Sequence, residues 1–296
     1  MCERAAPHKN AWTRTLIFAR YLWFFMDVPS LRLKGNIKIP QIGLGTWKLS
    51  GSQCVRTVRA ALELGYRHID TAQVYENESE IGEAIHSSDV QRSDLFITSK
   101  AWFENADQVS LRRSLMLSLE RLKTSYLDLF LLHWPTDKVP LEETIRALAE
   151  LRDQGLIRAF GVSNFGPENL ARALRTDRHL AVNQVEFHPF LYQKDLLALC
   201  SKSDVVLTAY SPIARGHVLG HKTLRAIGEK YGKSEVQVTL RWLLDKGVVV
   251  IPKASTREKL AANLDLDFKL LKKESAMIDA LNEDRRFVDP RWADWS

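Results

Sequence analysis

HIDTAQVYENESEIGEAIHSS (residues 68–88) contains one complete unit of the repeating pattern that decides the fold. HIDTA is a short apolar run typical of a buried strand, and ESEIGEAIHSS places Ile81, Ala84 and Ile85 on one face of a helix. The same succession recurs along the chain. We expect the other strands in IGLGT (42–46), LFITSK (95–100), LDLFLLH (127–133), IRAFGVSN (157–164), VNQVEF (182–187), VVLTAYSP (205–212) and VVVIPKA (248–254). We expect the other helices in residues 52–65, 107–124, 141–155, 167–176, 193–203, 221–232, 234–247 and 256–264.

These eight strand–helix units, of which the seventh has two helices, follow one another without a break in composition, which predicts a (β/α)8 TIM barrel of the α/β class. The strands are apolar on both faces, as parallel strands covered by helices should be. An N-terminal β-hairpin precedes the barrel, because apolar residues alternate on both sides of KGN (34–36). An open Rossmann sheet is excluded, since GLG (43–45) is followed by Lys48 where that motif requires a third glycine. We therefore expect a single barrel domain over residues 30–296.

The leader, residues 1–29, does not fit this pattern. Within it, LIFARYLWFFM (16–26) is too short to span a bilayer and contains Arg20. Basic residues before a short apolar run also occur in export signals, but no small-residue cleavage site follows here. We favour a start at Met26, with a peripheral N-terminal helix and an export signal as the alternatives.

Charge and cysteine content exclude several classes of function. The formal net charge is +6, and half of this surplus lies before Met26. The rest is too small, and too free of basic stripes with interleaved aromatic residues, to indicate a nucleic-acid partner. Cys2, Cys54 and Cys200 form neither a CxxC motif nor a Cys/His ligand spacing, which argues against a metal site and a disulfide framework. This cysteine usage fits a reducing cytoplasm.

Four side chains with useful chemistry lie at or just beyond the ends of three predicted strands: Asp70, Tyr75, Lys100 and His133. A (β/α)8 barrel collects all its strand ends at one mouth and builds its active site there. A tyrosine is a weak acid at neutral pH, so it needs a nearby cation to stabilise the phenolate that forms when it gives up its proton. Lys100 can provide that charge, and Asp70 can keep the lysine protonated. The set would suit protonation of a carbonyl oxygen during hydride transfer.

From about residue 30 onward the chain resembles the aldo-keto reductases, a barrel family of NAD(P)H-dependent carbonyl reductases. The similar stretches are GLGTW (43–47), DTAQVYENE (70–78), TSKAW (98–102), LLHWP (131–135), GVSNF (161–165), NQVEFHP (183–189), YSP (210–212) and IPK (251–253). Within the family, DTAQVYENE and ITSKAWFEN (97–105) are most similar to bacterial 2,5-diketo-D-gluconate reductases of the B type.

This resemblance implies reduction of small aldehydes and ketones to alcohols, with NADPH as the cofactor and NADH as the less favoured one. Methylglyoxal, keto sugar acids and β-keto esters are the substrates that it suggests. Nothing in the sequence demands a dimer or a membrane partner, so we expect a monomer, and the cysteine usage favours the cytoplasm. Some proteins with this barrel are instead regulatory subunits that sense cofactor state, and that role is the alternative.

The resemblance also implies roles for individual residues. Tyr75 is then the general acid, and His133 contacts the substrate carbonyl oxygen. The residues implied to bind the cofactor are Gly45, Thr46, Trp47, Asp70, Ser163, Asn164, Gln184, Tyr210, Ser211, Ile213, Gly216, Lys253, Ala254, Ser255, Arg257, Lys259 and Asn263. The residues implied to contact the substrate are Trp47, Tyr75, Trp102, His133 and Trp134, and Trp292 and Trp295 could close one side of the mouth.

IPKASTREKLAANL (251–264) departs from the family pattern for NADPH. Lys253 and Asn263 match, whereas Ala254 replaces a serine or threonine and Lys259 replaces an arginine. Lysine attracts the 2′-phosphate but lacks the planar fork of arginine. Arg257 could supply that fork at the start of the same helix, where backbone N–H groups also favour an anion. NADPH therefore remains the expected cofactor.

Overall fold

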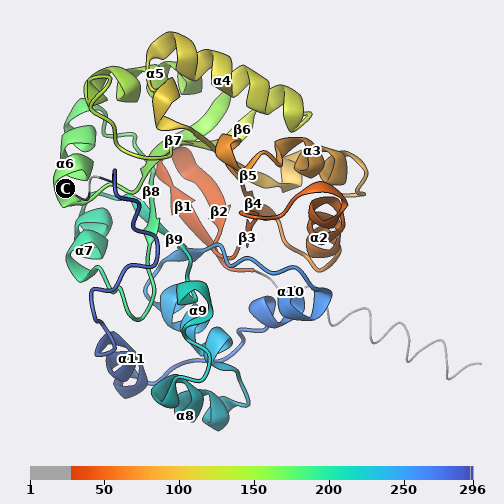
Figure 1. Ribbon diagram of the computed structural model, residues 1–296, viewed down its shortest axis with the longest axis vertical. Helices are drawn as coiled ribbons and strands as arrows, with labels where there is room; N and C mark the ends of the chain where they lie inside the picture. Colours follow the sequence, from red (N-terminus) through yellow and green to blue (C-terminus); the bar gives the residue numbers. More distant parts are fainter. Residues whose placement is uncertain (1–27, 294, 296) are drawn as a thin grey trace, which may run out of the picture.

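The computed structural model describes residues 28–293 and 295, and its centre is a sheet of parallel strands in the order β10-β9-β8-β7-β6-β5-β4-β3. The strands are β3 (Leu44–Gly45), β4 (His68–Asp70), β5 (Phe96–Ala101), β6 (Leu127–Leu132), β7 (Ile157–Ser163), β8 (Val182–Glu186), β9 (Val206–Tyr210) and β10 (Val249–Val250). Hydrogen bonds from Gly43 N to Val250 O (2.8 Å) and from Val250 N to Gln41 O (2.9 Å) join the two ends of the sheet. The sheet therefore closes on itself, and the predicted barrel is confirmed (Figure 1).

Helices surround the strands on the outside of the barrel (Figure 1). They are α2 (Gly51–Glu63), α3 (Glu78–His86), α4 (Gln108–Arg121), α5 (Leu141–Asp153), α6 (Pro167–Thr176), α7 (Lys194–Lys202), α8 (Lys222–Tyr231), α9 (Glu235–Asp245), α10 (Arg257–Leu264) and α11 (Lys272–Asp279). Short 3-10 helices are η1 (Lys34–Asn36), η2 (Gln73–Tyr75), η3 (Arg92–Asp94), η4 (Phe103–Asn105) and η5 (Ala214–Gly216). Every predicted helix is present, and α11 is an addition that the sequence pattern did not indicate.

The strands are apolar on both faces because each face belongs to a different core. In β6, Leu129 and Leu131 point into the barrel, while Phe130 and Leu132 pack beneath the helices. The inner core also contains Leu33, Ile37 and Ile39 of the N-terminal hairpin and residues at or near the starts of several strands. Alternation along each strand therefore fills both sides of the sheet.

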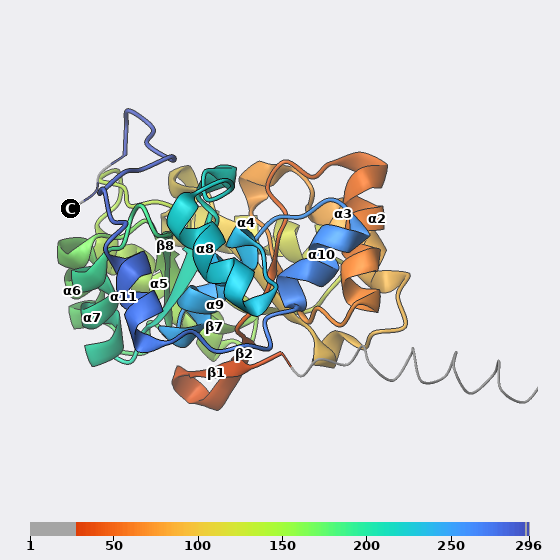
Figure 2. The ribbon, with the colours of Figure 1, turned by 90° about the horizontal axis from the view of Figure 1, so that it is seen from below.

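The hairpin closes the amino-terminal end of the barrel. It consists of β1 (Ser30–Leu33) and β2 (Ile37–Pro40), which pair antiparallel, and its turn contains Gly35 with a φ of 75°. Lys34 Nζ donates hydrogen bonds to Arg178 O (2.6 Å) and Leu180 O (3.1 Å), which fastens the hairpin to the barrel. Figure 2 shows the hairpin and the C-terminal segment (residues 282–293 and 295) at opposite ends of the molecule. The carboxyl-terminal mouth of the barrel thus remains available for a functional site.

Gly45 lies where β3 meets the strand end of β10, and this close approach leaves no room for a side chain. A Cβ atom at this position would lie 2.4 Å from the Ile251 carbonyl oxygen. Gly45→Ala is therefore expected to lower the free energy of unfolding by about 3 kcal/mol or more, because backbone would have to move. Gly155→Ala is the matched control, since Gly155 has open space around it and only a φ of 75° to disfavour alanine, at about 1 kcal/mol. Urea unfolding of both variants measures the difference, and equal losses would contradict this account of the seam.

The leader proposed for residues 1–29 lies outside the described residues except for Val28 and Pro29. In the part of the chain that the structure describes, no helix combines the length and the apolar character needed to cross a lipid bilayer.

Candidate active site

The four residues singled out at the predicted strand ends all lie at the carboxyl-terminal mouth of the barrel. Asp70 is the last residue of β4, and Tyr75 is the last residue of η2, which follows it. Lys100 is the penultimate residue of β5, and His133 follows β6 directly. Since β4, β5 and β6 are neighbours in the sheet, these side chains converge.

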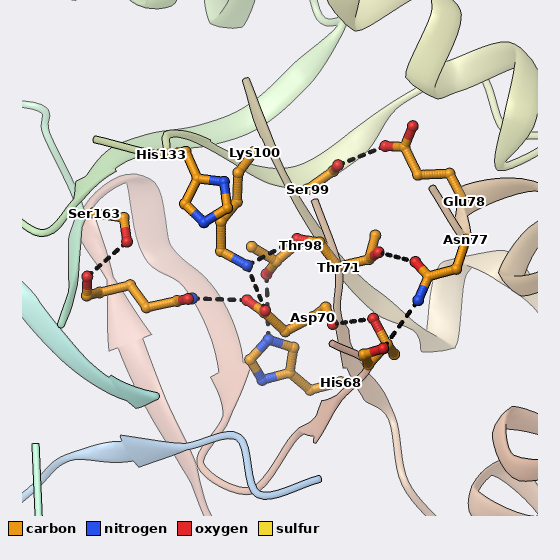
Figure 3. Close-up of polar contacts among 12 residues, drawn as sticks. His68, Asp70, Thr71, Asn77, Glu78, Thr98, Ser99, Lys100, His133 and Ser163 are labelled. Atoms are coloured by element: carbon orange, nitrogen blue, oxygen red, sulfur yellow. Dashed lines mark hydrogen bonds and ion pairs between the residues drawn. The ribbon is translucent and has the colours of Figure 1, made fainter. Parts of the chain in front are cut away.

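A buried ion pair forms the centre of this group. Lys100 Nζ donates to Asp70 Oδ1 at 2.5 Å and to Thr71 O at 2.8 Å (Figure 3). The Lys100 side chain is 0% exposed and that of Asp70 is 2% exposed. Gln184 Nε2 donates to the second carboxylate oxygen, Asp70 Oδ2, at 2.7 Å. Burial lowers the pKa of Lys100, and the Asp70 carboxylate opposes that effect, which favours the ammonium form.

Tyr75 and His133 lie beside this pair. Lys100 Nζ is 5.1 Å from the centre of the Tyr75 ring, and the Tyr75 and His133 rings meet edge to face at 5.8 Å. Burial raises the pKa of Tyr75, and the negative charge of Asp70 raises it further. Tyr75 therefore keeps its proton at neutral pH. Burial, together with the positive charge of Lys100, holds the pKa of His133 well below 6.5, so its imidazole is neutral.

A network that the sequence did not indicate fixes the loop that carries Tyr75. Asn77 is fully buried, and its Nδ2 donates to Thr46 O and Leu49 O, both at 2.9 Å. Its Oδ1 accepts a 2.7 Å hydrogen bond from the Thr71 hydroxyl. Asn77 thus ties the loop after β4 to the loop after β3 (Figure 3). The only sequence signal was its place in the DTAQVYENE stretch.

Several residues expected to hold the cofactor also converge at the mouth. The Ser163 hydroxyl donates to Gln184 O at 2.8 Å, and Asn164 Nδ2 donates to His133 O at 2.9 Å. The Tyr210 hydroxyl donates to Asn164 Oδ1 at 2.7 Å. Asn164 has a φ of 65°, a strained conformation of a kind that clusters at functional sites. These side chains thus form one connected group that reaches from His133 to Tyr210.

The loop after β9 and the loop after β3 approach each other across the mouth. Ser211 has a φ of 46°, and η5 contains Arg215 in the left-handed region and Gly216. The Arg215 guanidinium lies 5.1 Å from the Trp47 ring, which is 43% exposed. Of the remaining residues expected in these loops, Thr46 and Gly45 are buried, and Ile213 is half-buried. The two loops therefore flank one open side of the site.

The segment that would receive the 2′-phosphate lies farther out, around the start of α10. Lys253, Ser255 and Lys259 are exposed, whereas Ala254 and Asn263 are buried. Arg257 Nη1 forms an ion pair with Glu63 Oε2 at 2.6 Å, an interaction between two half-exposed side chains. Within the described residues, neither Lys253 nor Lys259 is in an ion pair. Their free positive charges fit the phosphate of a cofactor.

Tryptophan rings line the other side of the mouth. Trp102 contacts the His133 ring at 5.4 Å and the Trp292 ring at 5.8 Å. Trp134 contacts Trp292 at 4.9 Å and Trp295 at 5.3 Å. The C-terminal segment therefore does lie against the tryptophans that follow β5 and β6.

The mouth of this closed barrel holds a buried lysine–aspartate pair, a protonated tyrosine and a neutral histidine. These features place the protein in the class of barrel enzymes that carry acid–base groups at their strand ends. The Aldo/keto reductase family model matches residues 41–283, and the chain belongs to this family. It is thus an oxidoreductase of a family that uses a nicotinamide cofactor.

Individual relatives agree with this assignment. The glyoxal reductase of Bacillus subtilis is 43% identical over 260 residues, covering 87% of this chain and 94% of that protein. The Escherichia coli methylglyoxal reductase DkgA is 39% identical over 257 residues, covering 85% and 92%. A silkworm (Bombyx mori) aldo-keto reductase complexed with NADPH has a TM-score of 0.85 at 35% identity, covering 89% of this chain and 90% of that one.

Proposed function

We propose that this protein reduces small aldehydes and ketones to alcohols with NADPH, and that Tyr75 is the general acid. The observation that carries the proposal is the buried Lys100–Asp70 ion pair beside the Tyr75 ring. When bound, the nicotinamide would supply the hydride. The residues of this chain then have to deliver one proton to the carbonyl oxygen.

Tyr75 is suited to this task because its raised pKa keeps the proton in place until an oxyanion develops nearby. The nearby Lys100 ammonium would then stabilise the phenolate. His133, kept neutral by its surroundings, can hydrogen-bond the same carbonyl oxygen and set its direction.

The mouth fits a nicotinamide cofactor on the side opposite the tryptophans. The connected group of Ser163, Asn164 and Gln184 offers short hydrogen-bonding side chains for a carboxamide, and Tyr210 offers a flat ring for stacking. The charges at Lys253 and Lys259 lie where the chain continues from β10 into α10. A phosphorylated cofactor would gain most from these charges, which favours NADPH over NADH.

The aromatic wall offers apolar contact to a carbonyl compound that is large enough to reach it. The names of two relatives, glyoxal reductase and methylglyoxal reductase, point to small dicarbonyls as further substrates. A panel of methylglyoxal, 2,5-diketogluconate, benzaldehyde and a β-keto ester, each with NADPH and with NADH, tests the proposal through the loss of absorbance at 340 nm (a standard property of the reduced nicotinamide). No turnover with any member would contradict it.

Cofactor preference gives a sharper test at α10. We expect Lys259→Ala and Arg257→Ala each to narrow the preference for NADPH over NADH by roughly tenfold, because NADH has no group at the 2′ position. Arg257 should matter more, since its fork can bind phosphate through two hydrogen bonds once it leaves Glu63. The ratio of kcat/KM for the two cofactors is the measurement.

Glu63→Gln is the matched control for this pair of variants. It removes the competing carboxylate, so it should leave NADPH binding unchanged or slightly stronger. An unaltered ratio in both alanine variants, or equal use of both cofactors by the unmodified protein, would show that this segment does not bind the 2′-phosphate.

A further inference from the structure

Glu186 is a buried carboxylate at the mouth for which the proposed reaction has no use. It is the last residue of β8 and is 0% exposed. Side chains two apart on a strand share a face, so Glu186 points to the same side as Gln184, which contacts Asp70. Glu186 therefore lies one layer above the Lys100–Asp70 pair, within the barrel mouth.

Both oxygens of this carboxylate are used by the C-terminal segment (residues 282–293 and 295). Glu186 Oε1 accepts from the backbone N–H of Phe287 at 2.9 Å, and Oε2 accepts from that of Val288 at 3.0 Å. His188 Nε2 lies 3.2 Å from Oε1, and His188 is itself fully buried. A buried carboxylate that accepts two backbone N–H groups forms strong, directional hydrogen bonds.

The surroundings of Phe287 and Val288 extend this attachment. Phe190 O accepts from Glu283 N at 3.2 Å and from Arg285 N at 3.0 Å. The Phe287 ring stacks on His217 at 4.3 Å and contacts His188 at 5.3 Å. The segment is thus tied to the loop after β8 before it continues toward the tryptophans.

Beyond Val288 the same segment reaches the opposite side of the mouth. There Trp292 contacts Trp102 and Trp134, and Trp295 contacts Trp134. The hydrogen bonds of the described residues from 289 onward stay within the segment, from Ala293 N to Pro290 O at 2.9 Å and from Trp295 Nε1 to Asp289 Oδ1 at 3.0 Å, and Trp292 also contacts the Phe103 ring at 5.1 Å. The attachment at Glu186 is therefore the last strong one before the aromatic wall.

We propose that Glu186 is a positioning residue that holds the C-terminal segment so that Trp292 and Trp295 form one wall of the substrate site. This role rests on the proposed carbonyl reduction for its effect on substrates. Glu186 takes no part in proton delivery, since both its oxygens are occupied by backbone N–H groups. It determines instead which carbonyl compounds fit, because a bulky aromatic substrate needs the wall and a three-carbon dicarbonyl does not.

Glu186→Gln tests this role with little change in shape. An amide has one acceptor oxygen, and its NH2 group would face a backbone N–H, so at most one of the two hydrogen bonds survives. We expect KM for 4-nitrobenzaldehyde to rise roughly tenfold, the effect of losing one charged hydrogen bond. The kcat with methylglyoxal should stay within about twofold of the unmodified value.

Two further variants separate positioning from general destabilisation. Glu274→Gln removes another fully buried carboxylate, which binds Tyr231 and Lys230 near α11, and it should leave the ratio of the two KM values unchanged. Deleting residues 291–296 removes Trp292 and Trp295 and should raise KM for 4-nitrobenzaldehyde as Glu186→Gln does. Adding Glu186→Gln to that deletion should change KM no further, because the two changes act through the same segment.

Limited trypsin digestion gives a readout that needs no activity. The segment contains Arg285, Arg286 and Arg291, and cleavage there should become at least about tenfold faster in Glu186→Gln but not in Glu274→Gln. Unchanged cleavage, or equal KM increases for the two aldehydes, would overturn the proposal. If the unmodified protein reduces neither aldehyde, the proposed function fails, and the trypsin result still decides whether Glu186 holds the segment.

Discussion

Tyr75→Phe is expected to lower kcat for carbonyl reduction by at least about 100-fold, the lower range for loss of a general acid. The change removes only the hydroxyl group. The ring contacts with His133 at 5.8 Å and with Lys100 Nζ at 5.1 Å remain, so the fold and the ion pair should persist. Steady-state kinetics with methylglyoxal and a fluorescence titration with NADPH measure the two effects separately. Cofactor affinity should change little.

Tyr126→Phe is the matched control for this prediction. Tyr126 lies just before β6, at the amino-terminal end of the barrel, and its ring packs under the Arg92 guanidinium at 4.0 Å. That variant should keep its full kcat. A Tyr75→Phe protein with near-normal turnover would show that another group or water supplies the proton.

The sequence was sufficient to predict the barrel because each strand–helix unit carries its own local signal. Because β6 is apolar on both faces, it is expected to be covered on both faces. A parallel sheet gives such cover when it is closed into a barrel or has helices on both sides. The positions of Asp70, Lys100 and His133 could be predicted in the same way, because the carboxyl end of every strand in a (β/α)8 barrel lies at the same mouth.

Contacts between distant segments could not be predicted in this way. The hydrogen bonds from Phe287 and Val288 to Glu186 join residues about one hundred positions apart, and nothing in NQVEFHP (183–189) indicates them. The ion pair of Arg257 with Glu63 could not be predicted from the sequence either. The resting pKa of Tyr75 also depends on the fold, because burial and the charge of Asp70 raise it.

Asp70→Asn is expected to cost the protein about 3–5 kcal/mol of stability, because it leaves the buried Lys100 ammonium without its counter-charge. Lys100 is fully buried, and its remaining partners would be two neutral oxygens, the Thr71 carbonyl and the amide oxygen introduced at position 70. Urea unfolding at neutral pH measures the loss. The variant should also lose most of its carbonyl reduction, because Lys100 can then no longer stay charged and positioned beside Tyr75.

The pH dependence of this loss has a definite sign. Burial already lowers the pKa of Lys100 below 10.5 in the folded protein, and removing Asp70 lowers it further. Between that lowered pKa and 10.5, the unfolded chain binds more protons than the folded one, so stability rises with pH. The stability gap between Asp70→Asn and the unmodified protein should therefore narrow as the pH rises toward 10.5.

A double variant separates the cost of an unpaired charge from the loss of other contacts. Lys100→Met combined with Asp70→Asn removes both charges and keeps a side chain of similar volume, so it should recover at least about 2 kcal/mol relative to Asp70→Asn alone. Its gap to the unmodified protein should not narrow with pH through Lys100, since that group is gone. Activity should stay lost, because no cation then lies beside Tyr75.

A double variant no more stable than Asp70→Asn would mean that the pair matters through packing and the Gln184 hydrogen bond rather than through its charges. The predicted outcome instead makes the Lys100–Asp70 pair a feature kept for chemistry, since an apolar replacement serves the fold nearly as well.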